Sequence, residues 1–109
     1  FLGICLGLQL LFKESEETPG AEGLNLLPGK IFKIPAKEGF KIPHMGWNSL
    51  NVKDNARLFA GINANPYVYF EYSTHIHASV EKGNLFACQF HPEKSSETGL
   101  RILKNFAEL

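Results

Sequence analysis

A cysteine flanked by glycines is the first feature that could carry chemistry. In Gly3-Ile4-Cys5-Leu6-Gly7, small residues two positions either side of Cys5 permit a sharp turn from a strand into a helix. Free N–H groups and the helix dipole there favour the thiolate, lowering the thiol pKa from roughly 8.5 by about one unit or more. We predict that Cys5 is a nucleophile and that the Leu6 N–H binds the oxyanion. The alternative is a core cysteine.

A histidine and a glutamate two residues apart lie near the other end of the chain. In Gln89-Phe90-His91-Pro92-Glu93, His91 comes just past an apolar strand, where catalytic residues of open α/β sheets gather. Glu93 can orient the imidazole ring and stabilise its protonated form. With Cys5 they supply the nucleophile, base and orienting acid of a cysteine acyl-transfer enzyme. The alternative is a loop histidine beside a solvated glutamate.

Helices are expected near both ends of the chain, with strands between them. Residues 5–17 predict a helix with a broad apolar face, which Thr18-Pro19-Gly20 ends. A second helix from about Glu97, capped by Ser95 or Ser96, should turn an inner face toward the core. The residues of that face are Leu100, Leu103 and Ala107, flanked by Ile102 and Phe106.

The strands expected from alternation and apolar runs lie at 1–4, 30–35, 48–52, 67–70, 75–81 and 84–90, with a helical turn at 56–62. Lys82-Gly83 should join the last two strands as a hairpin. Together the elements predict an α/β fold, a partial open sheet flanked by helices.

The composition argues against several classes of function. Eleven basic and eleven acidic residues among 109 give a net charge of zero, so nothing favours nucleic acid or anionic membrane. No apolar run is long enough to cross a bilayer. Two cysteines cannot build a disulfide scaffold, so we expect a cytoplasmic location with both thiols reduced and Cys88 in the core. His75 and His77 share a strand face, but no cysteine or acidic cluster accompanies them, which favours a polar surface over a metal site.

The two motifs together resemble the triad glutamine amidotransferases. This similarity rests on residues 1–9 and 89–93. Members of that family hydrolyse glutamine through a γ-glutamyl thioester and pass ammonia to a partner synthase. The resemblance makes Cys5 the nucleophile, His91 the general base and acid, and Glu93 its orienter. It also places Gln9 and Glu17 at the glutamine site, and it implies no metal or organic cofactor.

A third motif resembles the glutaminase subunits of imidazole-glycerol-phosphate synthase. In those subunits a similar hexapeptide lies toward the cyclase partner; here it reads Pro43-His44-Met45-Gly46-Trp47-Asn48. Residues 10–17 and 92–100 resemble the same subunits. The resemblance implies ammonia delivery to a (β/α)-barrel cyclase in histidine biosynthesis. For Trp47 itself, a place in the core is the alternative to an interface.

Two departures from the family pattern stand out. The glycine-rich loop that supplies the second oxyanion donor is missing. After Phe70 the family continues with a His-Ser-Tyr segment and a hairpin, whereas this chain passes directly to Glu71-Tyr72-Ser73-Thr74, which resembles the far side of that hairpin. The chain opens at Phe1, directly in an expected buried strand. We therefore expect residues 1–109 to be a C-terminal fragment of the amidotransferase domain with an internal gap, and with little activity alone. The alternatives are a glutaminase for anthranilate, carbamoyl phosphate or guanylate synthesis, and an inactive binding module.

Overall fold

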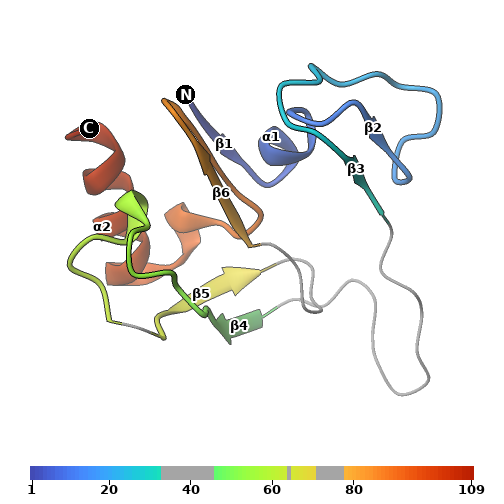
Figure 1. Ribbon diagram of the computed structural model, residues 1–109. Helices are drawn as coiled ribbons and strands as arrows, with labels where there is room; N and C mark the ends of the chain where they lie inside the picture. Colours follow the sequence, from blue (N-terminus) through green and yellow to red (C-terminus); the bar gives the residue numbers. More distant parts are fainter. Residues whose placement is uncertain (33–45, 64, 71–77) are drawn as a thin grey trace.

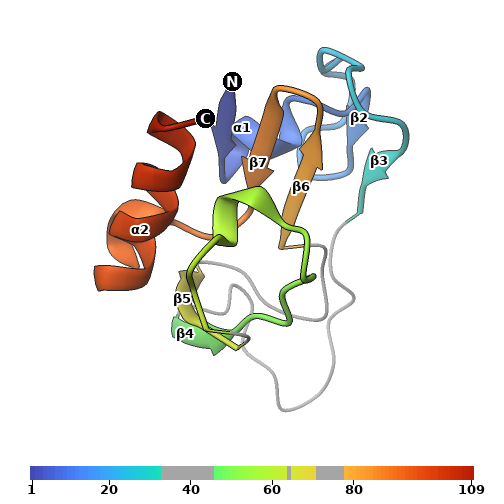
Figure 2. The same ribbon diagram turned by 60° about the vertical axis from the view of Figure 1, so that its left-hand side comes forward.

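The computed structural model describes residues 1–32, 46–63, 65–70 and 78–109. A three-stranded sheet of order β1-β7-β6 joins the two ends of the chain (Figures 1 and 2). β1 (Leu2–Ile4) pairs in parallel with β7 (Leu85–Cys88), and β6 (Ser79–Lys82) pairs with β7 in antiparallel orientation. The partial sheet with flanking helices confirms the predicted α/β class.

Each face of the sheet packs against a different hydrophobic cluster, because side chains alternate along a strand. Phe86 and Cys88 of β7 belong to the larger cluster, together with Ile102 of helix α2 (Ser96–Ala107). Ala87, between them, belongs to the smaller cluster beside helix α1 (Leu6–Gln9). The two helices therefore cover opposite faces of β7.

Two further strand pairs lie outside this sheet. β4 (Gly46–Ser49) and β5 (Tyr67–Phe70) form an antiparallel ribbon, in which Trp47 is opposite Tyr69. β2 (Glu14–Ser15) and β3 (Lys30–Ile31) form a short parallel pair beside α1 (Figure 1). The remaining elements are two 3-10 turns, η1 (Arg57–Phe59) and η2 (Pro92–Lys94).

The expected strands at 1–4 and 67–70, the helical turn in 56–62 and the hairpin at Lys82-Gly83 are confirmed. The strand placed at 48–52 instead begins at Gly46 and ends at Ser49. Residues 33–35 and 75–77 of two other expected strands lie outside the described residues. Within the described ranges, no helix has the length and apolar character that crossing a membrane requires.

The predicted helix over residues 5–17 is wrong, because α1 ends at Gln9. The carbonyls that a longer helix would need are taken by the segment around residues 23–27. Leu24 and Leu26 donate backbone N–H bonds to Leu10 and Leu11 at 2.8 Å, and Gly23 donates to Lys13 at 2.8 Å. A Cβ on Gly23 would overlap the carbonyl oxygen of Phe12, so this close approach requires glycine.

The predicted inner face of the C-terminal helix is also wrong. Leu100 is 67% exposed, whereas Gly99 and Ile102 are buried and Phe106 packs against the larger cluster. Gly99 determines which face of the helix turns inward, because a Cβ at this position would overlap the carbonyl oxygen of Pro92. The helix thus lies directly on η2, the turn that contains Glu93.

Candidate active site

Cys5 occupies the strand-to-helix turn that the sequence predicts. It is the N-cap residue of α1, with φ 52° and ψ −106°, a conformation that is strained for a residue other than glycine. Its N–H donates to the Cys88 carbonyl at 2.8 Å, which ties the turn to the end of β7. Strain held in place by surrounding hydrogen bonds is a feature of functional sites.

The two glycines around Cys5 have different structural roles. A Cβ on Gly3 would lie 2.7 Å from the carbonyl oxygen of Gly7, whereas a Cβ on Gly7 would have no atom within 4 Å. Close packing of β1 on α1 therefore requires glycine at position 3 only.

This difference predicts opposite results for two alanine substitutions. Gly3→Ala should lower the free energy of unfolding by about 1–3 kcal/mol, because backbone atoms must move apart. Gly7→Ala, within helix α1, should be neutral or stabilising by up to about 1 kcal/mol. Urea denaturation of the two full-length variants measures both values. Equal losses would show that the turn does not depend on contact between Gly3 and Gly7.

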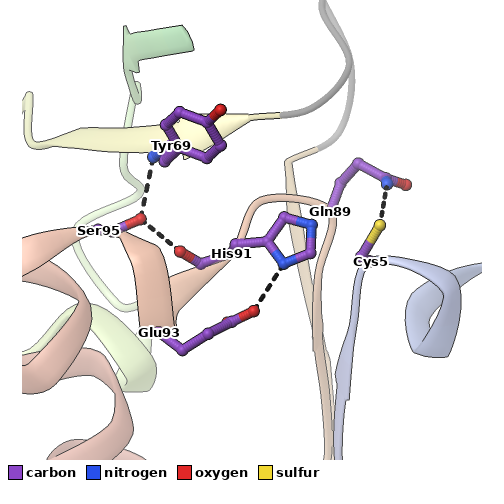
Figure 3. Close-up of polar contacts among 6 residues, drawn as sticks. All are labelled: Cys5, Tyr69, Gln89, His91, Glu93 and Ser95. Carbon is purple, nitrogen blue, oxygen red and sulfur yellow. Dashed lines mark hydrogen bonds and ion pairs between the residues drawn. The ribbon is translucent and has the colours of Figure 1, made fainter. Parts of the chain in front are cut away.

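His91 and Glu93 form a direct pair. The Nδ1 atom of His91 lies 2.7 Å from Oε1 of Glu93, and Pro92 between them begins η2. If Nδ1 carries the proton and donates to the carboxylate, Nε2 is left as the atom that can accept one. The His91 side chain is 14% exposed, and its ring lies between Glu93 on one side and Gln89 and Cys5 on the other (Figure 3).

The backbone of His91 is fixed by β5 and by a buried serine. The His91 N–H donates to the Tyr69 carbonyl at 3.0 Å. Ser95 Oγ accepts from the Tyr69 N–H at 2.9 Å and donates to the His91 carbonyl at 2.6 Å (Figure 3). The sequence predicts Ser95 or Ser96 only as a helix cap. Ser95 does occupy the N-cap position, but its side chain makes these bonds instead of a cap bond. Its position one turn after His91 was the available signal.

The residues predicted to bind glutamine do not all lie in one place in the structure. Leu6 opens α1, so its N–H belongs to the free first turn beside Cys5. Gln9 is buried, and its Nε2 lies 3.5 Å from Oε1 of Gln89, whose own Nε2 lies 3.7 Å from Cys5 Sγ. Glu17 lies in the exposed turn after β2, where its N–H donates to Ser15 Oγ at 3.2 Å. No polar contact among the described residues joins Glu17 to Cys5 or His91.

Half of the predicted interface hexapeptide is described. Gly46, Trp47 and Asn48 belong to β4, which begins two residues before the strand expected at 48–52. Trp47 is 50% exposed, and its ring meets that of Tyr69 edge to face with centroids 6.1 Å apart. Pro43, His44 and Met45 lie outside the described residues.

Cys88 is the core cysteine that the sequence predicts. It is fully buried, and burial, followed by the nearby Glu93 carboxylate and Cys5, raises the pKa of its thiol to about 12. Such a thiol is unreactive near neutral pH. Among the described residues, no group of three or more potential ligands could hold a metal ion, and His75 and His77 lie outside them.

The sequence matches a known family over most of its length. A family model for glutamine amidotransferase class-I matches residues 1–75. The chain therefore belongs to the class-I glutamine amidotransferases.

Its relatives include imidazole glycerol phosphate synthase subunits named HisH. The chain is 47% identical to the HisH subunit of Caldanaerobacter subterraneus, over 100% of its own length and 62% of that relative. It is 44% identical to the subunit of Methanocaldococcus jannaschii, over 100% of the chain and 63% of the relative. The chain thus spans about three fifths of the length of these relatives. The first alignment covers 127 positions for 109 residues, which leaves at least 18 positions without a counterpart and agrees with an internal gap.

Proposed function

We propose that residues 1–109 form the C-terminal part of a glutamine amidotransferase domain that hydrolyses glutamine and supplies ammonia to a cyclase subunit. One observation carries the proposal: β1 and β7 are parallel, so Cys5 and the His91–Glu93 pair follow the carboxyl ends of neighbouring strands. A nucleophile, a base and an oriented carboxylate at one sheet edge are the groups that thioester chemistry needs.

In the proposed reaction, His91 Nε2 takes the proton of the Cys5 thiol, and the thiolate attacks the carboxamide carbon of glutamine. The Leu6 N–H stabilises the oxyanion that forms on the carbonyl oxygen. His91 then returns the proton to the leaving nitrogen, so that ammonia departs and a γ-glutamyl thioester remains. Water, deprotonated by His91, attacks the thioester, releasing glutamate and the Cys5 thiol.

The surrounding residues have supporting roles in this proposal. Glu93 accepts a hydrogen bond from Nδ1 and stabilises the imidazolium present after each proton transfer. Gln9 and Glu17 contribute to the glutamine site, Gln9 from the buried position behind Gln89 and Glu17 from the exposed turn after β2. Neither a metal ion nor an organic cofactor takes part.

The partner in this proposal is the (β/α)-barrel cyclase that makes imidazole-glycerol phosphate in histidine biosynthesis. Support comes from the relatives, which are named as subunits of imidazole glycerol phosphate synthase. The surface assigned to this partner is the hexapeptide containing Trp47, whose ring is half exposed on β4. A cytoplasmic location belongs to the proposal and rests on two cysteines, Cys5 and Cys88, of which neither forms a disulfide.

A glutamine-mimicking electrophile should label Cys5 and leave Cys88 untouched in the folded full-length protein. The reason is that Cys5 lies at the turn beside His91, whereas Cys88 is fully buried with a raised pKa. Peptide mass spectrometry measures the labelled fraction of each cysteine, and Cys88 in the same sample is the matched control. Labelling of Cys88 alone, or of both cysteines equally, would contradict the assignment of Cys5 as nucleophile.

A further inference from the structure

Two buried glutamine amides lie end to end beside the Cys5 sulfur. Gln9 is 9% exposed and Gln89 is 8% exposed. The Nε2 atom of Gln9 lies 3.5 Å from Oε1 of Gln89, and Nε2 of Gln89 lies 3.7 Å from Cys5 Sγ (Figure 3 shows the second contact). In the described part of the chain, the buried polar side chains are those of Gln9, Gln89 and Ser95. All three are next to Cys5 or His91. Burying polar groups is costly, and their concentration here calls for a local reason.

The order of these contacts determines which end of the Gln89 amide faces the sulfur. An amide has a donating NH2 end and an accepting oxygen end. Because Gln9 donates to the Gln89 oxygen, the Gln89 NH2 group is left to face Cys5. With the Gln9 amide oriented as it is, reversing Gln89 would bring two NH2 groups together. In this arrangement Gln9 therefore supports the orientation in which Gln89 donates to Cys5.

The backbone also holds Gln89 at a fixed place relative to the sulfur. The Gln89 N–H donates to the Ala78 carbonyl at 2.8 Å, and the Cys5 N–H donates to the carbonyl of the preceding residue, Cys88, at 2.8 Å. The two side chains therefore extend from neighbouring backbone segments that are bonded to each other. An amide held in this way needs little rearrangement as charge develops on the sulfur.

We propose that Gln89 is a further catalytic residue, whose side-chain amide donates to Cys5 Sγ and stabilises the nucleophile as the thiolate, with Gln9 orienting that amide. This inference rests on the proposed role of Cys5. A hydrogen bond to a charged acceptor is stronger than one to a neutral acceptor, so the amide favours thiolate over thiol. An amide does not titrate, and Gln89 therefore complements His91: the histidine moves the proton and the glutamine stabilises the charge left behind.

The test compares Gln89→Met with the unsubstituted full-length protein. Methionine is similar in length and has no donor. The rate of Cys5 alkylation by iodoacetamide is followed against pH by peptide mass spectrometry, together with kcat and KM for glutamine hydrolysis. We expect the midpoint of the alkylation profile to rise by about one pH unit and kcat to fall about tenfold, the lower end of the effect of losing a hydrogen bond to a charged group. KM should change little.

Two more variants make the test specific. Gln9→Met leaves Gln89 in place but removes the group that orients it, so the midpoint should rise by a smaller amount. Leu85→Met changes the packing of the same strand, β7, without touching either amide, and should leave the midpoint unchanged.

The outcomes separate this inference from the proposed function. A folded Gln89→Met protein with the midpoint and kcat of the unsubstituted protein would overturn the inference, while glutamine hydrolysis dependent on Cys5 would still support the proposed function. If Gln89→Met does not fold, an unshifted midpoint in Gln9→Met overturns it equally. A full-length protein that neither hydrolyses glutamine nor reacts first at Cys5 would overturn both.

Discussion

Replacing His91 with asparagine is expected to lower kcat for glutamine hydrolysis by about 10²- to 10⁴-fold in the full-length protein. In the proposed reaction His91 takes the thiol proton and returns it to the leaving nitrogen, and positioned acid–base catalysis contributes rate factors of about this size. The measurement is glutamate release with the cyclase present, at saturating glutamine. A loss confined to KM would show that His91 binds substrate and does not transfer protons.

A smaller loss of kcat is expected for Glu93→Gln, because the amide oxygen can still accept a hydrogen bond from His91 Nδ1 and keep the imidazole ring oriented. The substitution removes the carboxylate charge, which in the proposed reaction stabilises the imidazolium. A hydrogen bond to a charged group contributes about 1.5–3 kcal/mol, or roughly 10- to 150-fold in rate. Glu97→Gln is the matched control, since Glu97 is an exposed acid in the first turn of α2. Equal activities of the Glu93 and Glu97 variants would contradict the role of the pair.

What the sequence predicts best are the parts of the site whose geometry is local. The Gly3–Gly7 turn and the His91–Glu93 pair each lie within five residues, and their meeting requires one long-range fact, that β1 and β7 are parallel neighbours. The sequence places each motif at the end of an expected strand, but it is the structure that shows these two strands to be neighbours.

The features that the sequence did not predict depend on contacts between distant segments. The helix after Cys5 ends early because carbonyls at Leu10 and Leu11 bind the segment at residues 24–27, which apolar periodicity within 5–17 does not encode. The face that α2 buries depends on the close approach of Gly99 to the Pro92 carbonyl. This steric requirement outweighs the apolar pattern of the helix. Gln89 and Ser95 were missed as site residues because their partners, Cys5 and Tyr69, are 84 and 26 positions away.

Trp47 connects the proposed partner surface to the backbone that holds His91. Its ring packs against that of Tyr69, directly opposite on β5, and the Tyr69 backbone bonds to the His91 N–H and to Ser95. A half-exposed aromatic ring supported by a second one is well suited to anchor an interface, because little side-chain motion is left to lose on binding. Cyclase binding at Trp47 would therefore act on the strand that holds the backbone of His91.

Truncating Trp47 to alanine in the full-length protein is expected to weaken cyclase binding by about 2 kcal/mol or more, roughly 30-fold in Kd. Stimulation of glutamine hydrolysis by the cyclase should fall with it, whereas the melting temperature should change little because the ring is half exposed. Calorimetric titration gives the affinity and thermal denaturation gives the stability. Leu100→Ala is the control, because it removes an exposed apolar side chain from a different element, α2. It should leave the affinity unchanged. A large fall in melting temperature with unchanged cyclase affinity would instead place Trp47 in the core.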